Sequence, residues 1–217
     1  MRIALSGKMG SGKSTAANLL VREMDFKTLS VGSAIKPTAN LLIQDQDSFR
    51  THLYHVLPNT IETKRAVERV IASFNEAYAN AEWISDGNEG YIKNEPYRDL
   101  LQKYPMMIRE VLGEDVFLRL ILNEHEPSDE SLLNDDIRLV GEKQHLESLG
   151  FRIIRLDINE DVQRERLMKA YGKIDEQALR HPTETALDHE TFDLRLDVSE
   201  MSEEEVAKHI KEFLFGK

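Results

Sequence analysis

Cysteine is absent from the 217 residues of this chain, and long apolar runs are absent as well. Without cysteine the protein can form no disulfide, no thiolate zinc site and no cysteine nucleophile. No stretch approaches the ~20 consecutive apolar residues that a membrane-spanning helix needs. The first apolar run is broken by Lys8 and lacks a small-residue cleavage pattern, so we expect no secretory signal peptide. These absences favour a cytoplasmic protein that does not enter a membrane.

Basic residues are also fewer than acidic ones. The chain has 28 lysines and arginines against 39 aspartates and glutamates, which gives a net charge of −11. A protein that binds double-stranded nucleic acid usually presents a basic face, so this balance argues against nucleic acid as a partner. It leaves a small anionic ligand open, because a few basic side chains in one cleft can reverse the local potential.

A glycine-rich stretch lies near the start of the sequence. GKMGSGKS, residues 7–14, matches G-x-x-x-x-G-K-[ST] at every fixed position. An apolar run at residues 2–6 precedes it, and a helical pattern over residues 13–24 follows. In this order, backbone N–H groups and a helix N-terminus can surround phosphate oxygens. A glycine-rich turn without a ligand is the alternative, but the context favours a phosphate-binding loop, or P-loop.

The P-loop motif assigns chemical roles to its residues. Lys13 is expected to reach the β- and γ-phosphates of a nucleotide, and the Ser14 hydroxyl to ligate Mg²⁺. No guanine-recognition motif of the NKxD type is present, so ATP with Mg²⁺ is the expected cofactor pair. The residues predicted to hold the nucleotide are Gly7, Lys8, Met9, Gly10, Ser11, Gly12, Lys13, Ser14 and Thr15.

Four further segments read as strands, and helical patterns separate most of them. They are residues 27–31, a segment ending near Asp135 or Asp136, residues 151–157 and residues 192–198. This alternation predicts βαβ units and an α/β fold of the P-loop NTPase type, with a parallel five-stranded sheet flanked by helices. The last helix is marked by a capping box from Ser202 to Glu205.

The second and third predicted strands are separated by a long region that we interpret as several helices. Asn59 with Glu62 indicates one helix start, and apolar residues from Val67 to Tyr78 repeat at helical spacing. Residues 106–122 repeat in the same way around Gly113. One helix is enough for a crossover, so this region predicts a helical insertion at the sheet edge where ligands bind. The acidic stretch 124–130 is interpreted as a solvated loop.

Four later segments carry further motifs. They are VGSAIK (31–36), MMIREVLGEDVFLR (106–119), DDIRLVGEKQHLESLGFRIIRLDI (135–158) and HPTETALDHETFDLRLD (181–197). With the P-loop they resemble segments of the phage-type deoxynucleoside monophosphate kinases, of the nucleoside-monophosphate-kinase-like P-loop family. Those enzymes carry A-x-x-L-K, R-E-x-L-x-x-x-G, DVRF-x-NE and P-S-E-T-A-L-D at the corresponding places. Here DIRLVGE replaces DVRFPNE, and Thr183 replaces the serine.

This resemblance implies a kinase that transfers the γ-phosphate of ATP to a (deoxy)nucleoside monophosphate, giving the diphosphate. It also implies one P-loop kinase domain. Its core would comprise residues 1–36, 130–160 and 190–217, its helical substrate-binding insertion residues 37–129, and its lid residues 160–190. The partners would be small-molecule nucleotides, with no nucleic acid and no membrane; a homodimer is compatible with the sequence.

Two residues after the third strand are candidates for the reaction itself. Asp136 is assigned to Mg²⁺ or to the acceptor, with a turn-capping carboxylate as the alternative. Arg138 lies two residues later and can fork onto a phosphate. Glu142 either hydrogen-bonds the acceptor or holds Arg138.

Other basic residues are candidates for the two substrates. Lys36 and Arg109 are predicted to bind the acceptor's phosphate. Arg164 and Arg166 are predicted to close over the γ-phosphate, as lid arginines do. For each of these lid arginines, the alternative is a solvated helix with i,i+4 pairs such as Glu160–Arg164.

Two other functions stay open at this point. One is a P-loop kinase for another phosphorylated small molecule, of the dephospho-coenzyme A or phosphomevalonate type. The other is a nucleotide-hydrolysing switch protein, although no water-orienting glutamine is evident after the third strand. A monophosphate acceptor needs no general base, because its second pKa of about 6 leaves it anionic at neutral pH.

Overall fold

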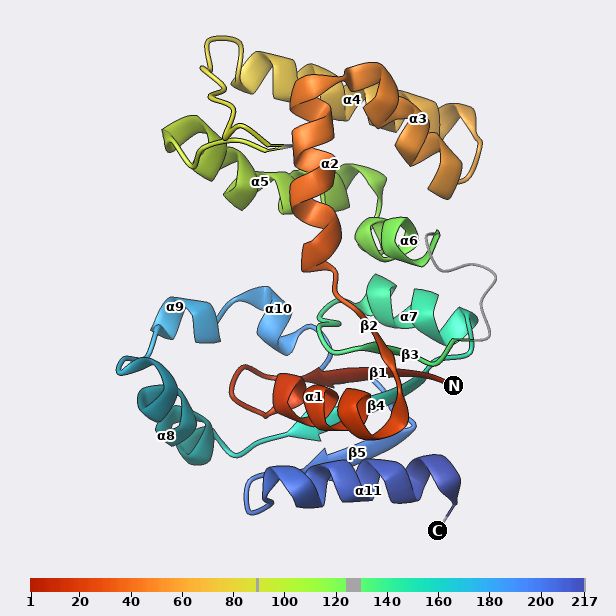
Figure 1. Ribbon diagram of the computed structural model, residues 1–217, viewed down its shortest axis with the longest axis vertical. Helices are drawn as coiled ribbons and strands as arrows, with labels where there is room; N and C mark the ends of the chain where they lie inside the picture. Colours follow the sequence, from red (N-terminus) through yellow and green to blue (C-terminus); the bar gives the residue numbers. More distant parts are fainter. Residues whose placement is uncertain (89, 124–129, 217) are drawn as a thin grey trace. The chain divides into compact units, whose positions relative to one another are not determined.

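A computed structural model of the chain describes residues 1–88, 90–123 and 130–216. The chain divides into two compact units, of which the first comprises Met1–Ser30 with Pro127–Lys217 and the second Val31–Glu126. In the sequence, the second unit is inserted between strands β2 and β3 of the first unit, as the colours of Figure 1 show. The first unit holds the sheet and the glycine-rich loop, and the second is mainly helical.

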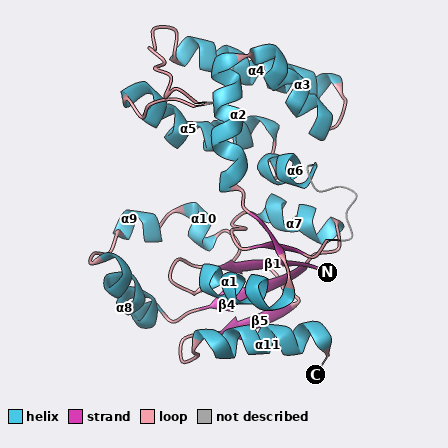
Figure 2. Cartoon of the chain, in the orientation of Figure 1, coloured by secondary structure: helices cyan, strands magenta, loops and turns pink. Residues whose placement is uncertain are grey.

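The first unit is built around a five-stranded sheet, drawn in magenta in Figure 2, whose strand order is β2-β3-β1-β4-β5. Every neighbouring pair in it is parallel, with β1 central between β3 and β4. The predicted α/β fold with a parallel five-stranded sheet is therefore confirmed, and the fold is P-loop NTPase-like. The strands are β1 (Arg2–Gly7), β2 (Lys27–Leu29), β3 (Leu132–Asn134), β4 (Arg152–Asp157) and β5 (Leu194–Asp197).

Helices flank this sheet and complete its core. Ile3 of β1, Leu20 of α1, Ile154 of β4 and Ile210 of α11 are all fully buried in one apolar cluster. Each such side chain contributes about 1.5–3 kcal/mol through its removal from water. The helices of this unit are α1 (Lys13–Met24), α7 (Val140–Ser148), α8 (Glu160–Tyr171), α9 (Glu176–Leu179), α10 (Pro182–Thr185) and α11 (Glu203–Phe215).

The ends of several elements differ from the sequence-based bounds. β2 ends at Leu29 rather than at residue 31, because Val31 already caps α2. β5 spans four residues, yet Asp193 and Val198 on either side of it still donate backbone N–H groups to β4 carbonyls. The predicted capping box is present: Ser202 Oγ accepts from the N–H of Glu205 at 3.2 Å.

The second unit contains the helices predicted for the insertion. They are α2 (Gly32–Gln44), α3 (Gln46–Val56), α4 (Ile61–Ala77), α5 (Glu95–Leu112) and α6 (Val116–Asn123). The apolar repeat from Val67 to Phe74 is the buried face of α4, and Gly113 separates α5 from α6 with a φ of 107°. α4 is capped by Thr60, not by Asn59, because the Thr60 hydroxyl accepts the N–H of Thr63.

The acidic stretch interpreted as a loop lies mostly outside the described residues, which resume at residue 130. Glu130 itself pairs with Lys27 at 3.1 Å. Among the helices that the structure describes, none is both long and apolar enough to cross a membrane.

Candidate active site

The glycine-rich loop joins β1 to α1, as the motif requires. A Cβ on Gly7 would lie 2.5 Å from Ser11 Oγ and 2.6 Å from the carbonyl oxygen of Leu156. No side chain fits in that space. Gly12 stands at the N-cap of α1 with a φ of 84°, a left-handed conformation that favours glycine. The shape of the loop therefore requires glycine at position 7 and favours it at position 12.

The start of α1 offers backbone donors to an anion. Its N-cap, Gly12, has no side chain to cap the first turn, so those N–H groups depend on another acceptor. The buried Ser11 hydroxyl also has no hydrogen-bond partner within the described part of the chain. The positive end of the helix dipole points the same way. These features fit the phosphates of a nucleotide.

Lys13 lies inside the loop that it is predicted to serve. Its Nζ donates to the carbonyl oxygens of Gly7 at 2.6 Å and Lys8 at 3.0 Å. Burial, followed by the nearby charge of Arg138, lowers the pKa of Lys13 from 10.5 to about 8. A phosphate would restore the solvation that burial removes, so this ammonium group is prepared for an anionic ligand.

ATP binding is expected to weaken as the pH rises above 8. In the protein without ATP, Lys13 loses its proton near that pH. Besides burial, the charges of Arg138, Glu184, Arg155 and Asp135 contribute to its pKa. Above it, binding must take up one proton, so affinity should fall by about tenfold per pH unit. Calorimetric dissociation constants on either side of pH 8 check this, with Lys13→Met as the variant that should show no such slope. An equal slope in both proteins would contradict the assignment.

Arg138 and Glu184 meet beside the loop. The Arg138 guanidinium donates through Nη1 to Glu184 Oε1, and Glu184 Oε2 accepts the N–H of Met9 at 2.6 Å. Sequence reasoning missed Glu184, although it lies within the quoted TETALD motif. The predicted neighbour Glu142 accepts the backbone N–H groups of Arg138 and Leu139, at 2.9 and 3.1 Å. It thus caps α7, and these two bonds go to backbone groups, not to the guanidinium.

The two aspartates after β3 occupy different surroundings. Asp136 accepts from Asn134 Nδ2 at 2.9 Å and from Ser30 Oγ at 3.2 Å. Asp135 is the one whose charge acts on Lys13, raising its pKa against the effect of burial. The carboxylates, with the Ser14 hydroxyl, are oxygen donors of the kind that Mg²⁺ binds. The prediction of Asp136 as a metal ligand therefore gains Asp135 as a second candidate.

Arg164 and Arg166 have different partners. The Arg164 guanidinium forks onto Glu176 at 2.6 and 3.0 Å and also contacts Glu160 at 3.1 Å, so it joins α8 to α9. Arg166 Nη2 donates to the carbonyl oxygens of Val198 and Ser199 at 2.9 and 3.4 Å. The contact of these arginines with a γ-phosphate stays a prediction.

A cavity of about 620 Å³ adjoins the P-loop within the first unit. Loop and α1 residues form one side, and the last turns of α8 with the start of α11 form the other. Its size suits the nucleoside part of a donor nucleotide. Lining residues that could contact a base include Thr15, Arg166, Tyr171, Met201 and Val206. The sequence predicted a site role only for the first two of them.

Replacing Arg166 by alanine should weaken ATP binding by about 3- to 10-fold, because its guanidinium can stack on a base. Only carbonyl oxygens hold this side chain within the described residues, so no carboxylate neutralises its charge. Arg22→Ala, at an exposed position of α1, is the control. Titration of a fluorescent ATP analogue measures both. Equal affinities for Arg166→Ala and the control would remove Arg166 from the donor site.

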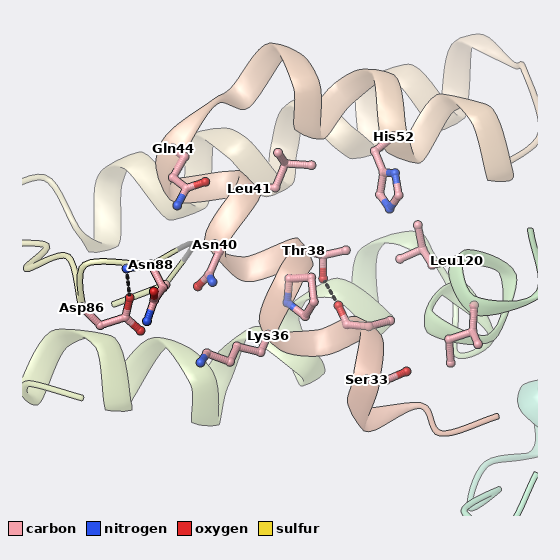
Figure 3. A pocket seen from close by; sticks show the side chains of 14 residues that line it. Ser33, Lys36, Thr38, Asn40, Leu41, Gln44, His52, Asp86, Asn88 and Leu120 are labelled. Atoms are coloured by element: carbon pink, nitrogen blue, oxygen red, sulfur yellow. Dashed lines mark hydrogen bonds between the residues drawn. The ribbon is translucent and has the colours of Figure 1, made fainter. Parts of the chain in front are cut away.

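The second unit has a larger cavity, of about 920 Å³, along one face of α2. Figure 3 shows Lys36, Asn40, Asp86 and Asn88 close to one another beside this helix. Tyr97 donates its hydroxyl hydrogen to Asn40 Oδ1 at 2.6 Å and so fixes that amide. Lys36 therefore lines a cavity with both polar and apolar walls. Its contact with an acceptor phosphate stays a prediction.

Arg109, the other residue predicted to bind the acceptor, has different surroundings. It is not among the residues that line this cavity. Its guanidinium lies over the ring of Phe117, 5.1 Å from the centroid. Its contact with an acceptor phosphate stays a prediction.

Comparisons with known proteins add little. No protein-family model matches the sequence, and no curated protein matches it. One similar solved structure is the crystal structure of TT1252 from Thermus thermophilus, with 17% sequence identity over 99% of this chain and 95% of that chain, and a TM-score of 0.49. The fold class therefore rests on the strand order and on the P-loop between β1 and α1.

Proposed function

We propose that this protein is a Mg²⁺-dependent phosphotransferase that moves the γ-phosphate of ATP to a (deoxy)nucleoside monophosphate. One observation carries the proposal: a complete P-loop has Lys13 buried within it and Arg138 close by at the carboxyl edge of the sheet. Phosphoryl transfer needs alignment and positive charge around the transferring group more than covalent chemistry, and these residues supply both.

Each chain segment has a part in this mechanism. Lys13 and the backbone N–H groups of the loop would hold the donor phosphates, while Mg²⁺ held by Ser14 and the aspartates after β3 would neutralise charge on them. Arg138 would contact the transferring group. Arg166 with the cavity of the first unit would receive the donor base, and the cavity beside α2 would receive the acceptor, with Lys36 near its phosphate.

The acceptor is the finer part of the proposal. Amide and carboxylate groups line the α2 cavity, and such groups match the donor and acceptor pattern of a nucleobase edge. A monophosphate acceptor is already an anionic nucleophile at neutral pH. No side chain then has to remove a proton from it, unlike in kinases that act on alcohols.

An ADP-release assay tests the proposal directly. ATP and Mg²⁺ are incubated with a panel of nucleoside and deoxynucleoside monophosphates, dephospho-coenzyme A and phosphomevalonate. We expect slow ATP hydrolysis alone and rapid ADP formation with at least one nucleotide, because kinases exclude water until the acceptor closes the site. Phosphorylation of only a non-nucleotide acceptor would show that the proposed acceptor is wrong and that the proposed phosphoryl transfer is right. Rapid ATP hydrolysis without any phosphorylated product would instead indicate a switch protein.

A further inference from the structure

Glu184 is a buried carboxylate in contact with the phosphate-binding loop. Only 3% of its side chain is exposed, so its charge has lost nearly all of its hydration. Such burial costs several kcal/mol unless charge-assisted hydrogen bonds replace the water. Its two oxygens have different partners: one accepts from the Arg138 guanidinium and the other from the N–H of Met9 at 2.6 Å. Both partners belong to the proposed phosphate site.

The backbone of Met9 is hydrogen-bonded through both its N–H group and its carbonyl oxygen. Glu184 accepts its N–H, and Gln163 Nε2 of α8 donates to its carbonyl oxygen at 2.7 Å. Gln163 is itself buried. Met9 directly precedes Gly10, where the loop turns with a φ of 80°. The orientation of the loop tip is therefore set by two side chains from distant parts of the chain.

Part of the Arg138 guanidinium remains able to donate to a ligand. Its interaction with Glu184 uses Nη1, and within the described residues Nε and Nη2 have no side-chain acceptor. Its side chain is 38% exposed, so these nitrogens can reach a ligand. We infer that Glu184 is a positioning residue, which holds the Arg138 guanidinium and the Met9 peptide where both can serve the phosphates of a bound nucleotide. This inference rests on the proposed function.

The segment that carries Glu184 has other attachments. Asp188 accepts from Arg155 Nη2 at 2.5 Å and pairs with Lys8 at 3.3 Å, and the Leu187 side chain is buried. Glu190 pairs with Lys143 of α7 at 3.3 Å. The segment is thus anchored without Glu184, and we expect removal of the Glu184 charge to leave the fold intact.

The sign of the effect on nucleotide affinity separates positioning from competition. A carboxylate that merely occupied the phosphate's place would have to leave before ATP could bind, so its removal would tighten binding. Removing any negative charge near a polyanion would act in the same direction. A positioning carboxylate gives the opposite result, because the loop and Arg138 lose their orientation.

The test is a mutant cycle on Glu184→Gln, Arg138→Ala and the double variant, with Glu190→Gln as the matched control. Glutamine can still accept the Met9 N–H but cannot pair with Arg138 as an ion. We expect kcat to fall by about 10²-fold in Glu184→Gln, as misplacement of a catalytic group does. ATP affinity should fall, and the double variant should be no slower than Arg138→Ala. Glu190→Gln should keep wild-type kcat.

Hydrogen exchange at residues 8–12 gives a readout that needs no turnover. Exchange there should rise in Glu184→Gln, because a neutral amide oxygen accepts the Met9 N–H more weakly than a carboxylate does. Glu190→Gln should leave it unchanged. Glu184→Asp keeps the charge and should recover part of the lost kcat; it also replaces Glu184→Gln if that variant does not fold.

Several results would overturn the inference. These are tighter ATP binding by Glu184→Gln with turnover retained, additive losses in the double variant, and equal losses in Glu184→Gln and Glu190→Gln. If the wild-type protein phosphorylates no acceptor, the proposed function fails separately. The inference is then judged on ATP binding and exchange alone: weaker binding with faster exchange at residues 8–12 supports it, and unchanged or tighter binding overturns it.

Discussion

Lys13→Met protein should fold normally and lose phosphoryl transfer by at least about 10³-fold, as happens when a preorganised donor to a developing charge is removed. Lys13 provides the only ammonium group that donates into the loop backbone within the described residues, through the carbonyl oxygens of Gly7 and Lys8. Its charge acts most strongly in the transition state, so turnover should fall more than ATP affinity. Steady-state kinetics and calorimetry measure the two effects separately.

The same substitution has a stability signature with a definite sign. The folded-state pKa of Lys13 is lowered from 10.5 to about 8, so the unfolded chain binds this proton more tightly. Keeping the ammonium buried at neutral pH then costs about 3 kcal/mol, a cost that disappears as the pH rises from 8 towards 10.5. Between pH 8 and 10.5 the free energy of unfolding of the wild-type protein should therefore rise relative to that of the Lys13→Met variant. Denaturant titrations at each pH measure both.

Two outcomes would contradict this account of Lys13. A folded Lys13→Met protein with near-wild-type turnover would show that the loop does not bind the transferring phosphate. A stability difference that does not change between pH 8 and 10.5 would show that the ammonium is not buried as described. Lys208→Met, at an exposed position of α11, controls for the loss of a lysine as such.

Arg138→Ala should lower kcat by about 10³-fold, in the range found for arginines that contact a transferring phosphoryl group. ATP affinity should change far less, because the contact matters mainly once the acceptor is in place. Arg138→Lys should recover little, since an ammonium cannot both pair with Glu184 and fork onto a phosphate.

Steady-state kinetics with the accepted monophosphate, and calorimetric ATP titration, measure these effects. Arg152→Ala is the matched control, because Arg152 is the first residue of β4, at the amino edge of the sheet, and donates to the Leu214 carbonyl oxygen. Normal turnover in Arg138→Ala would move this arginine to a structural role and would also remove the basis for a positioning role of Glu184.

The features that sequence reasoning predicts well here are local ones. The P-loop is a contiguous motif, and α1 runs from Lys13 to Met24 as its apolar spacing indicates. β1 has the apolar run Ile3–Leu5, and β4 is buried from Ile153 to Leu156 although Arg155 interrupts its apolar residues; such burial is typical of parallel strands covered on both faces. Such patterns depend on neighbouring residues, so one sequence contains all the information needed to find them.

Side-chain partners across the chain are what the sequence does not predict. Glu184 is far along the chain from Met9, and no pattern in the intervening residues links the two. Arg164 and Arg166 look alike in sequence, yet the first forks onto Glu176 and the second is held by backbone carbonyls near the end of β5. These differences arise from packing, which sets the direction in which each side chain leaves its helix.

The order of the strands has a consequence for how the chain folds as it is synthesised. β1 is the first strand made, but Arg2 pairs with Leu132 and Ile3 with Arg152, so the centre of the sheet waits for partners from the far side of the helical unit. Residues of the helical unit contact one another instead, and they emerge from the ribosome while β1 is still unpaired. Closing a long loop costs little more entropy than closing a short one, but it slows folding, and an unpaired apolar strand is prone to aggregation. Early compaction of the helical unit would shorten the path between β2 and β3, whose later pairing at Leu29 and Asn134 allows the sheet to close.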